Sequence, residues 1–95
     1  MSKNDDLLAQ FAFDGRIYSL EGNRTPDDKI KRQVGKIGEM VEDITTNGQA
    51  TIITPSIKLK SGCEIYTIQD VDNEMMLAIK IENLYYTAIF MEELD

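Results

Sequence analysis

Histidine and tryptophan are absent from this sequence of 95 residues, and cysteine occurs once, at Cys63. Without histidine, the chain lacks the side chain that most often serves as a general base or as a metal ligand. One cysteine cannot form a disulfide within the chain, so nothing in the sequence points to an oxidising compartment. We therefore predict a protein that is not an enzyme and that holds no metal and no other cofactor.

Positive charge is also scarce, because 17 acidic residues stand against 10 basic ones and the formal net charge is −7. Double-stranded DNA and anionic membranes are bound by dense positive charge, so neither is an expected partner. The longest apolar run, residues 75–79, is far shorter than the ~20 residues that cross a bilayer. Residues 1–6 carry acid where a secretion signal carries base, and no long apolar stretch follows. These absences predict a cytoplasmic protein.

Residues 26–46 carry the most regular helical pattern in the sequence. Thr25 and Pro26 suit the N-cap and the first position of a helix, and Asn47 with Gly48 suits its end. Between these signals, apolar residues recur at alternating spacings of four and three: Ile30, Val34, Ile37, Val41 and Ile44. This periodicity predicts one amphipathic helix.

Strand signals stand on both sides of this segment. The pair Asp14-Gly15 suits a type I′ turn and predicts a hairpin between strands at about 10–13 and 16–20. Further strands are predicted at 50–54, 57–60, 63–68, 75–81 and 84–91, where β-branched or alternating apolar residues occur.

Two of the later hairpins carry a predicted register. A loop over residues 60–62 with Gly62 in the left-handed conformation places Leu59 opposite Cys63 and Ile57 opposite Ile65. A turn at Glu82-Asn83 gives a second set of partners, namely Ile81 with Leu84, Ile79 with Tyr86, Leu77 with Ala88 and Met75 with Phe90. Each register places apolar side chains opposite one another on one face.

The order of these elements predicts an α+β domain. One amphipathic helix, at about 26–46, is expected to pack on a curved, mainly antiparallel sheet of five to six strands, in the order β-β-α-β-β-β-β. The chain is expected to form one domain over residues 1–95, near the small end of what buries a sound core. Its ends, 1–9 and 92–95, are expected to be loose.

Half of the basic residues gather around the start of the predicted helix: Arg24, Lys29, Lys31, Arg32 and Lys36. Basic side chains next to the free N–H groups of a helix start could hold a phosphate. The ligand would be a nucleotide or a short RNA, with Tyr66 or Tyr85 available to stack a base. The alternative is a solvated helix face with charge pairs along the helix.

The sequence Gly35-Lys36-Ile37-Gly38, with Val41 and Ile44 after it, resembles the GXXG loop of KH domains. In that family the loop joins two helices and clamps a nucleic-acid backbone, so the resemblance implies a nucleic-acid site. The apolar periodicity instead favours one unbroken helix in which the glycines allow a neighbour to approach closely.

A second patterned group of carboxylates consists of Asp70, Asp72 and Glu74. Clustered carboxylates are what Ca²⁺ prefers. The EF-hand pattern then requires Gly where Met75 stands and Glu where Ile81 stands. Both requirements fail, so we predict a solvated acidic loop.

The predicted hairpin 75–81/84–91 has one more apolar face than a solvated sheet needs. Its outer side carries Met76, Tyr85, Ile89 and Met91. Met and Tyr are common at protein interfaces. Two interpretations remain, namely an interface with a partner or a second copy, and a second core beneath a strongly curved sheet.

Together these patterns predict a small acidic interaction or regulatory protein of the inhibitor type. It is expected to dock to a protein partner, to form a homo-oligomer, and to present carboxylates to a basic surface. The alternative is an anion-binding protein that holds a nucleotide or a short RNA at the five basic residues.

Overall fold

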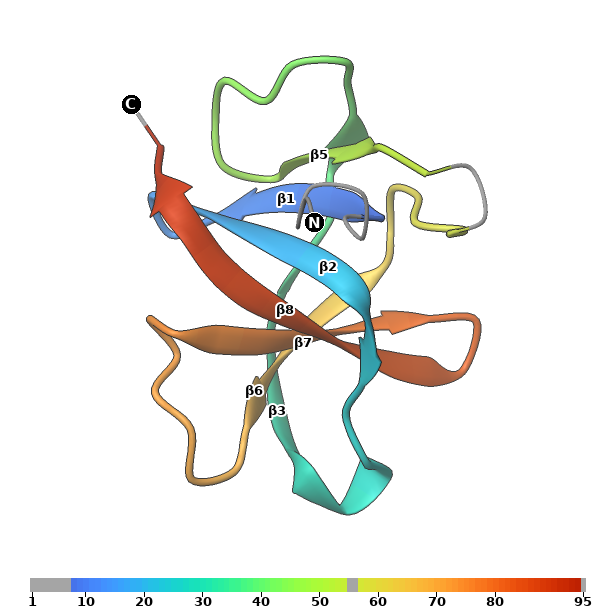
Figure 1. Ribbon diagram of the computed structural model, residues 1–95, viewed down its shortest axis with the longest axis vertical. Coiled ribbons are helices and arrows are strands. Elements are labelled where there is room, and N and C mark those ends of the chain that lie inside the picture. The colour runs from blue at the N-terminus through green and yellow to red at the C-terminus, as the bar shows by residue number, and fades with distance from the viewer. Residues whose placement is uncertain (1–7, 55–56, 95) are drawn as a thin grey trace, which may run out of the picture.

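The computed structural model of the protein describes residues 8–54 and 57–94. Over these ranges the fold is all-β, with eight strands in one mixed, mostly antiparallel sheet that curls into a half-barrel (Figure 1). The strands are β1 (Ala9–Phe13), β2 (Arg16–Arg24), β3 (Ile30–Lys36), β4 (Glu39–Met40), β5 (Gln49–Ile52), β6 (Glu64–Ile68), β7 (Met76–Ile81) and β8 (Leu84–Glu93). A 3₁₀ helix, η2 (Asp27–Lys29), precedes β3, and no helix among the described residues is long and apolar enough to cross a membrane.

The strand order is β3-β6-β7-β8-β2-β1-β5-β4, and β4 with β5 forms the one parallel pair of the described sheet. The two end strands, β3 and β4, are consecutive in the chain and are separated by Ile37 and Gly38 alone. The Ile37 N–H donates to the Cys63 carbonyl (2.8 Å), and the Ile37 carbonyl accepts from the Gly62 N–H (2.7 Å). The next N–H, of Gly38, donates to the Gly48 carbonyl (2.8 Å). The chain therefore passes directly from one end of the sheet to the other, behind the sheet in Figure 1, which requires the sheet to curl.

Apolar side chains from the strands, and from Ile37 between β3 and β4, fill the concave side of the curl. The largest fully buried ones are Phe11, Tyr18, Leu20, Ile37, Ile65, Leu77 and Ile79. The rings of Phe11 and Tyr18 stack with their centroids 5.5 Å apart. Ile57, Leu59 and Cys63, from the irregular segment before β6, complete this core. One core on one side of the sheet leaves the opposite, convex side to the outer surface.

Two predicted hairpins are confirmed. Asp14 (φ 54°) and Gly15 (φ 79°) both lie in the left-handed region that a type I′ turn requires, between β1 and β2. The β7–β8 ladder pairs Ile81 with Leu84, Ile79 with Tyr86 and Leu77 with Ala88, as predicted. The fourth predicted pair lies beyond the ladder: the Phe90 N–H donates to the Met75 carbonyl (2.8 Å), but the Met75 side chain is 59% exposed and is not part of the core face. In both hairpins the turn residues and the alternation of apolar and polar side chains specify the same register, so the local sequence was sufficient to predict the hairpin.

The predicted helix over 26–46 is wrong, and the α+β fold class is wrong with it. The segment forms η2, β3 and β4 instead. All five apolar residues of the predicted stripe are Ile or Val, whose branched side chains favour strands, and two glycines interrupt them. Register shifts on either side of Gln33 add residues to β3, which is how a spacing near 3.6 fits a strand.

The local signals assigned to that helix have other roles. Thr25 is buried and shares a 2.6 Å hydrogen bond with the Thr87 hydroxyl, so it caps no helix. The Gly35–Gly38 sequence joins β3 to β4, so the helix–loop–helix that the resemblance to KH domains implies is absent from this described segment.

The predicted strand 57–60 and its register are also wrong. Residues 58–60 have no strand assignment, and β6 pairs with β3 and β7. The edge of β6 that this segment was expected to fill is taken by β3, which the sequence pattern had assigned to a helix. Gly62 is left-handed as predicted (φ 96°), and the side chains of Leu59 and Cys63 are buried.

The chain ends are more ordered than expected where they are described. Ala9 belongs to β1 and is fully buried, and β8 continues to Glu93. The Leu94 N–H donates to the Gly15 carbonyl (2.9 Å). Residues 1–7 and 95 of the predicted loose ends lie outside the described residues.

Gly35 allows β1 and β3 to approach each other across the inside of the curl. A Cβ at this position would lie 2.9 Å from Phe13 Cε1, closer than a methyl group and an aromatic carbon can pack. At Gly38 the nearest atom to such a Cβ, the Gly48 carbonyl oxygen, is 3.5 Å away, which is ordinary contact. The close approach expected of the glycines therefore occurs at Gly35.

We expect Gly35→Ala to lower the free energy of unfolding by about 1–3 kcal/mol, because the Phe13 ring must shift. The matched variant Gly38→Ala should stay within about 0.5 kcal/mol of the parent protein. Urea unfolding measures both values. Adding Phe13→Leu should recover part of the loss in Gly35→Ala, and equal losses in the two glycine variants would contradict the steric explanation.

Candidate functional site

The convex sides of β6, β7 and β8 form one continuous outer surface. Cross-strand pairs place Tyr66 beside Ala78, Ala78 beside Thr87, and Met76 beside Ile89. These positions alternate with core residues of the same strands, so their side chains lie on the outer face. We call this surface the convex patch, and it consists of Tyr66, Met76, Ala78, Tyr85, Thr87 and Ile89.

Side chains within the convex patch pack on one another. Ala78 is fully buried although it lies on the outer face, because its neighbours on β6 and β8 cover it. The rings of Tyr66 and Tyr85 meet edge to face with centroids 5.3 Å apart, and Lys80 Nζ lies 5.8 Å from the centre of the Tyr85 ring. Met91 continues the apolar surface along β8 and is 44% exposed. The patch is therefore an ordered apolar and aromatic surface.

A hydrogen bond fixes the tyrosine at one end of the patch. The Tyr66 hydroxyl donates to Glu64 Oε1 at 2.6 Å. This bond to a carboxylate, together with desolvation, raises the pKa of Tyr66 from its ordinary 10.0 to about 12. Tyr66 therefore remains a neutral phenol across the physiological range, which suits packing and stacking and does not suit proton transfer.

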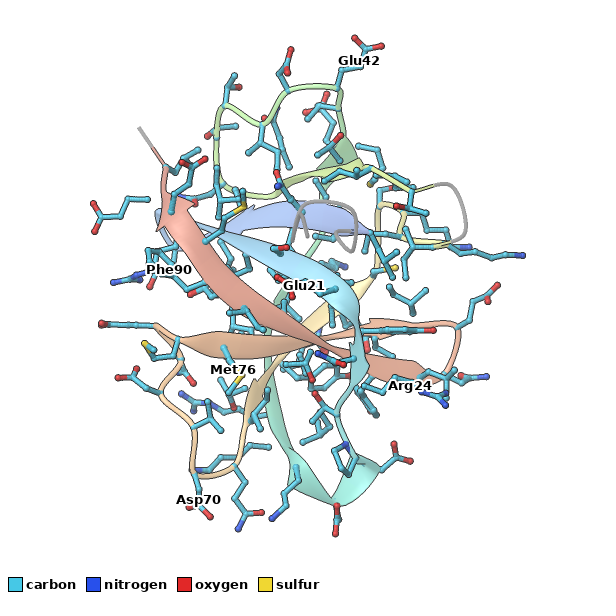
Figure 2. The ribbon with its side chains drawn as sticks, in the orientation of Figure 1. Glu21, Arg24, Glu42, Asp70, Met76 and Phe90 are labelled. Carbon is cyan, nitrogen blue, oxygen red and sulfur yellow. The ribbon has the colours of Figure 1, made fainter. Side chains whose placement is uncertain are left out.

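Charged side chains of both signs border the convex patch, with Lys80 and Arg24 beside Tyr85 and carboxylates elsewhere. Glu64 lies beside Tyr66 on β6, and Glu92 pairs with Ile17 at the other end of β8. Glu21 is exposed on β2, two residues along the strand from Ser19, which pairs with Ile89. In Figure 2, Glu21 and Met76 lie on opposite sides of β8. The patch thus has an apolar centre, basic residues at its Tyr85 end, and an acidic border formed by Glu21, Glu64 and Glu92.

The structure does not gather the five predicted basic residues into one site. All five are exposed. Lys31 and Arg32 line a groove with the loop after β6, whereas Arg24 lines a separate groove of about 270 Å³ next to Tyr85. Lys36 pairs with Glu64 at the other end of β3, and Lys29 belongs to η2. Because residues 26–46 form no α-helix, the start of an α-helix on which the predicted anion site depended is not there.

Two of the groups that could carry out chemistry, Cys63 and Tyr18, are placed in the core. Cys63 is buried in the core, and burial raises the pKa of Tyr18, whose hydroxyl donates to the Asn73 carbonyl (2.9 Å). Within residues 8–54 and 57–94, no three acidic or cysteine side chains are grouped closely enough to hold a metal ion. The residues with the most distinctive surface arrangement are those of the convex patch.

Most of this surface could be predicted from the sequence, and Tyr66 could not. Met76, Tyr85, Ile89 and Met91 share the outer side of β7 and β8, as the alternation predicts. From the sequence, Tyr66 is only a residue available to stack a base. Its position opposite Ala78 depends on the β6–β7 pairing, and no local sequence signal specifies that pairing.

We expect Glu64→Gln to lower the pKa of Tyr66 toward 10.0 from about 12, because the carboxylate no longer opposes ionisation. Alkaline titration by tyrosinate absorbance measures this change, and Tyr66→Phe identifies the Tyr66 component.

The folded protein holds the Tyr66 proton more tightly than the unfolded chain, so stability should fall as the pH rises from about 10 to about 12. This fall should be smaller in Glu64→Gln than in the parent protein, and Glu21→Gln is the control. A Tyr66 titration that is unchanged in Glu64→Gln would refute the assignment of the raised pKa to Glu64.

No protein-family model matches the chain, and neither a curated protein nor a solved structure is significantly similar to it. The side chains described above therefore carry the functional inference by themselves.

Proposed function

We propose that this protein is a non-catalytic docking module that binds a partner protein through the convex patch. The proposal rests on the composition of this face, where Met76, Tyr85 and Ile89 are half-buried on an outer sheet surface. The solvated side of an antiparallel sheet ordinarily carries polar side chains. Met adapts its shape to a partner, and Tyr offers a large rigid surface, which is why both suit interfaces.

The charge around the patch selects the kind of partner. Residues 69–95 contain seven acidic residues and one basic residue, Lys80. Glu21 and Glu64 add to the acidic border. A partner that carries Lys and Arg around an apolar centre would complement this surface and would be drawn to it by long-range attraction.

Binding of this kind would make the protein a regulator of the inhibitor type. The acidic border would occupy the partner's basic residues, and the apolar centre would exclude water from the contact. A basic surface that ordinarily holds nucleic acid is the clearest target, since the carboxylates would then compete with phosphates for the same side chains.

Self-association through the same face is the competing use of the patch and was predicted from the sequence. Two copies would each bring a net charge of −7 to the contact. Their repulsion disfavours such a dimer, and a basic partner does not incur this cost. The proposal therefore commits to a basic partner protein.

A photo-crosslinking residue placed at Met76, in cells that make the protein, should capture a partner rich in Lys and Arg. Adding Ile89→Glu should abolish the capture, because a carboxylate then occupies the apolar centre. Binding of the captured partner, once purified, should weaken as salt rises. Far-ultraviolet circular dichroism confirms that the Ile89→Glu variant is folded.

The matched control places the crosslinker at Asp43, which is exposed on the loop before β5 and outside the patch. Equal capture from Asp43 and from Met76 would contradict the proposal. Capture of a second copy of the chain, with a dimer by light scattering that strengthens with salt, would replace the basic partner by a homo-oligomer.

A further inference from the structure

A polar groove of about 540 Å³ lies between the edge strand β3 and the loop that joins β6 to β7. Its volume falls within the range of small-molecule sites. The residues that line it are Lys31, Arg32, Thr67, Ile68, Asp70, Val71, Asp72 and Asn73. The groove is separate from the convex patch, since no residue belongs to both.

The groove is lined in part by a largely buried threonine, Thr67, whose hydroxyl bonds to no described residue. Thr67 is 4% exposed. In the described chain the one fully buried side-chain polar atom without a partner is Ser19 Oγ, so the Thr67 hydroxyl still reaches the open groove, where it can bond to a molecule that enters. A ligand in the groove would supply the missing partner, with Ile68, which is 7% exposed, beside it.

Opposite charges face each other across the groove without pairing. Lys31 and Arg32 come from β3, and Asp70 and Asp72 come from the loop. Both ion pairs found in the described part of the chain belong to Arg16, so neither wall of the groove neutralises the other. An anion alone would meet two carboxylates, and a cation alone would meet two bases. A molecule that carries both charges would satisfy the two walls together.

The acidic wall is held in place from outside the groove. The Tyr18 hydroxyl donates to the Asn73 carbonyl (2.9 Å), and Arg16 pairs with Glu74 at 3.5 Å. Asp72 Oδ1 accepts from the Glu74 N–H (2.9 Å), which leaves its second oxygen available. A loop fixed in this way loses little conformational freedom when a ligand binds.

We propose that this groove binds a small zwitterion, with its carboxylate at Arg32 and Lys31 and its ammonium at Asp70 and Asp72. A guanidinium binds a carboxylate through two parallel hydrogen bonds, and the carboxylates accept from the ammonium. The Thr67 hydroxyl bonds the ligand at the base of the groove. This site is independent of the docking function proposed above, so either can fail without the other.

Three related compounds test the proposal by amide NMR titration of the full-length chain. The zwitterion ε-aminocaproate should shift the resonances of Arg32, Thr67 and Asp70 in a saturable manner and leave those of the convex patch unchanged. Caproate and hexylamine each lack one of the two charges and should bind at least about tenfold more weakly.

Three variants assign the contacts. Arg32→Gln and Asp70→Asn should each weaken ε-aminocaproate binding at least about tenfold, and Asn tolerates the left-handed backbone of Asp70 (φ 63°). Thr67→Val keeps the shape of the side chain, suits a strand, and should weaken binding by a smaller factor. Lys36→Gln, on the same strand but outside the groove, is the control and should bind as the parent protein does.

Each contrary result has a definite meaning. Equal binding of caproate would leave an anion site at Lys31 and Arg32 and overturn the zwitterion proposal. Equal binding of hexylamine would do the same in favour of a cation site. No saturable shift with ε-aminocaproate, or a shift unaffected by Arg32→Gln, would overturn the site itself.

Discussion

The curled sheet depends on the backbone of Ile37 and Gly38, where the chain passes from β3 to β4. Ile37 bonds to the segment before β6, and Gly38 bonds to the segment before β5, so one peptide unit ties together the two ends of the sheet. The Ile37 side chain is 1% exposed and lies in the core that this closure encloses. An open sheet of the same strands would present unpaired edges and an uncovered apolar face. The convex patch and the groove beside β3 both take their positions from this closure.

What could be predicted from the sequence is what is decided within about ten residues. Asp14-Gly15 and Glu82-Asn83 specified their turns, and the alternation of β7 and β8 specified both a register and the outer face with Met76 and Ile89. The prediction for residues 30–44 was wrong because the spacing of their apolar residues fits a helix, while the strands with which they pair, β5 and β6, lie further along the chain. The abundance of Ile and Val there, and the glycines, were the available signals for strands. The hydroxyl of Thr67 and its groove had no sequence signal, since they arise only when β3 lies beside β6.

The charge of the molecule is divided between two surfaces. The C-terminal strands and the loop before them are acidic, whereas β3 carries Lys31, Arg32 and Lys36 with no acid among its residues. Charged side chains and register shifts on an end strand are the devices by which proteins prevent edge-to-edge association. The basic residues that resemble an anion site in the sequence therefore have a structural role as well. Arg32 and Lys31 combine this role with the wall of a groove.

The placement of β3 has a consequence for biosynthesis. Residues 30–40 find their partners only in segments synthesised later, β5 on one side and β6 on the other. In the hairpin of β1 and β2, β2 likewise pairs with β8, which is the last strand to be synthesised. Long-range pairing of this kind is slow, and the incomplete chain exposes strand edges while it is being formed. The positive charge on β3 then acts before any ligand or partner is met, because it keeps neighbouring nascent chains from adding to an unfinished sheet.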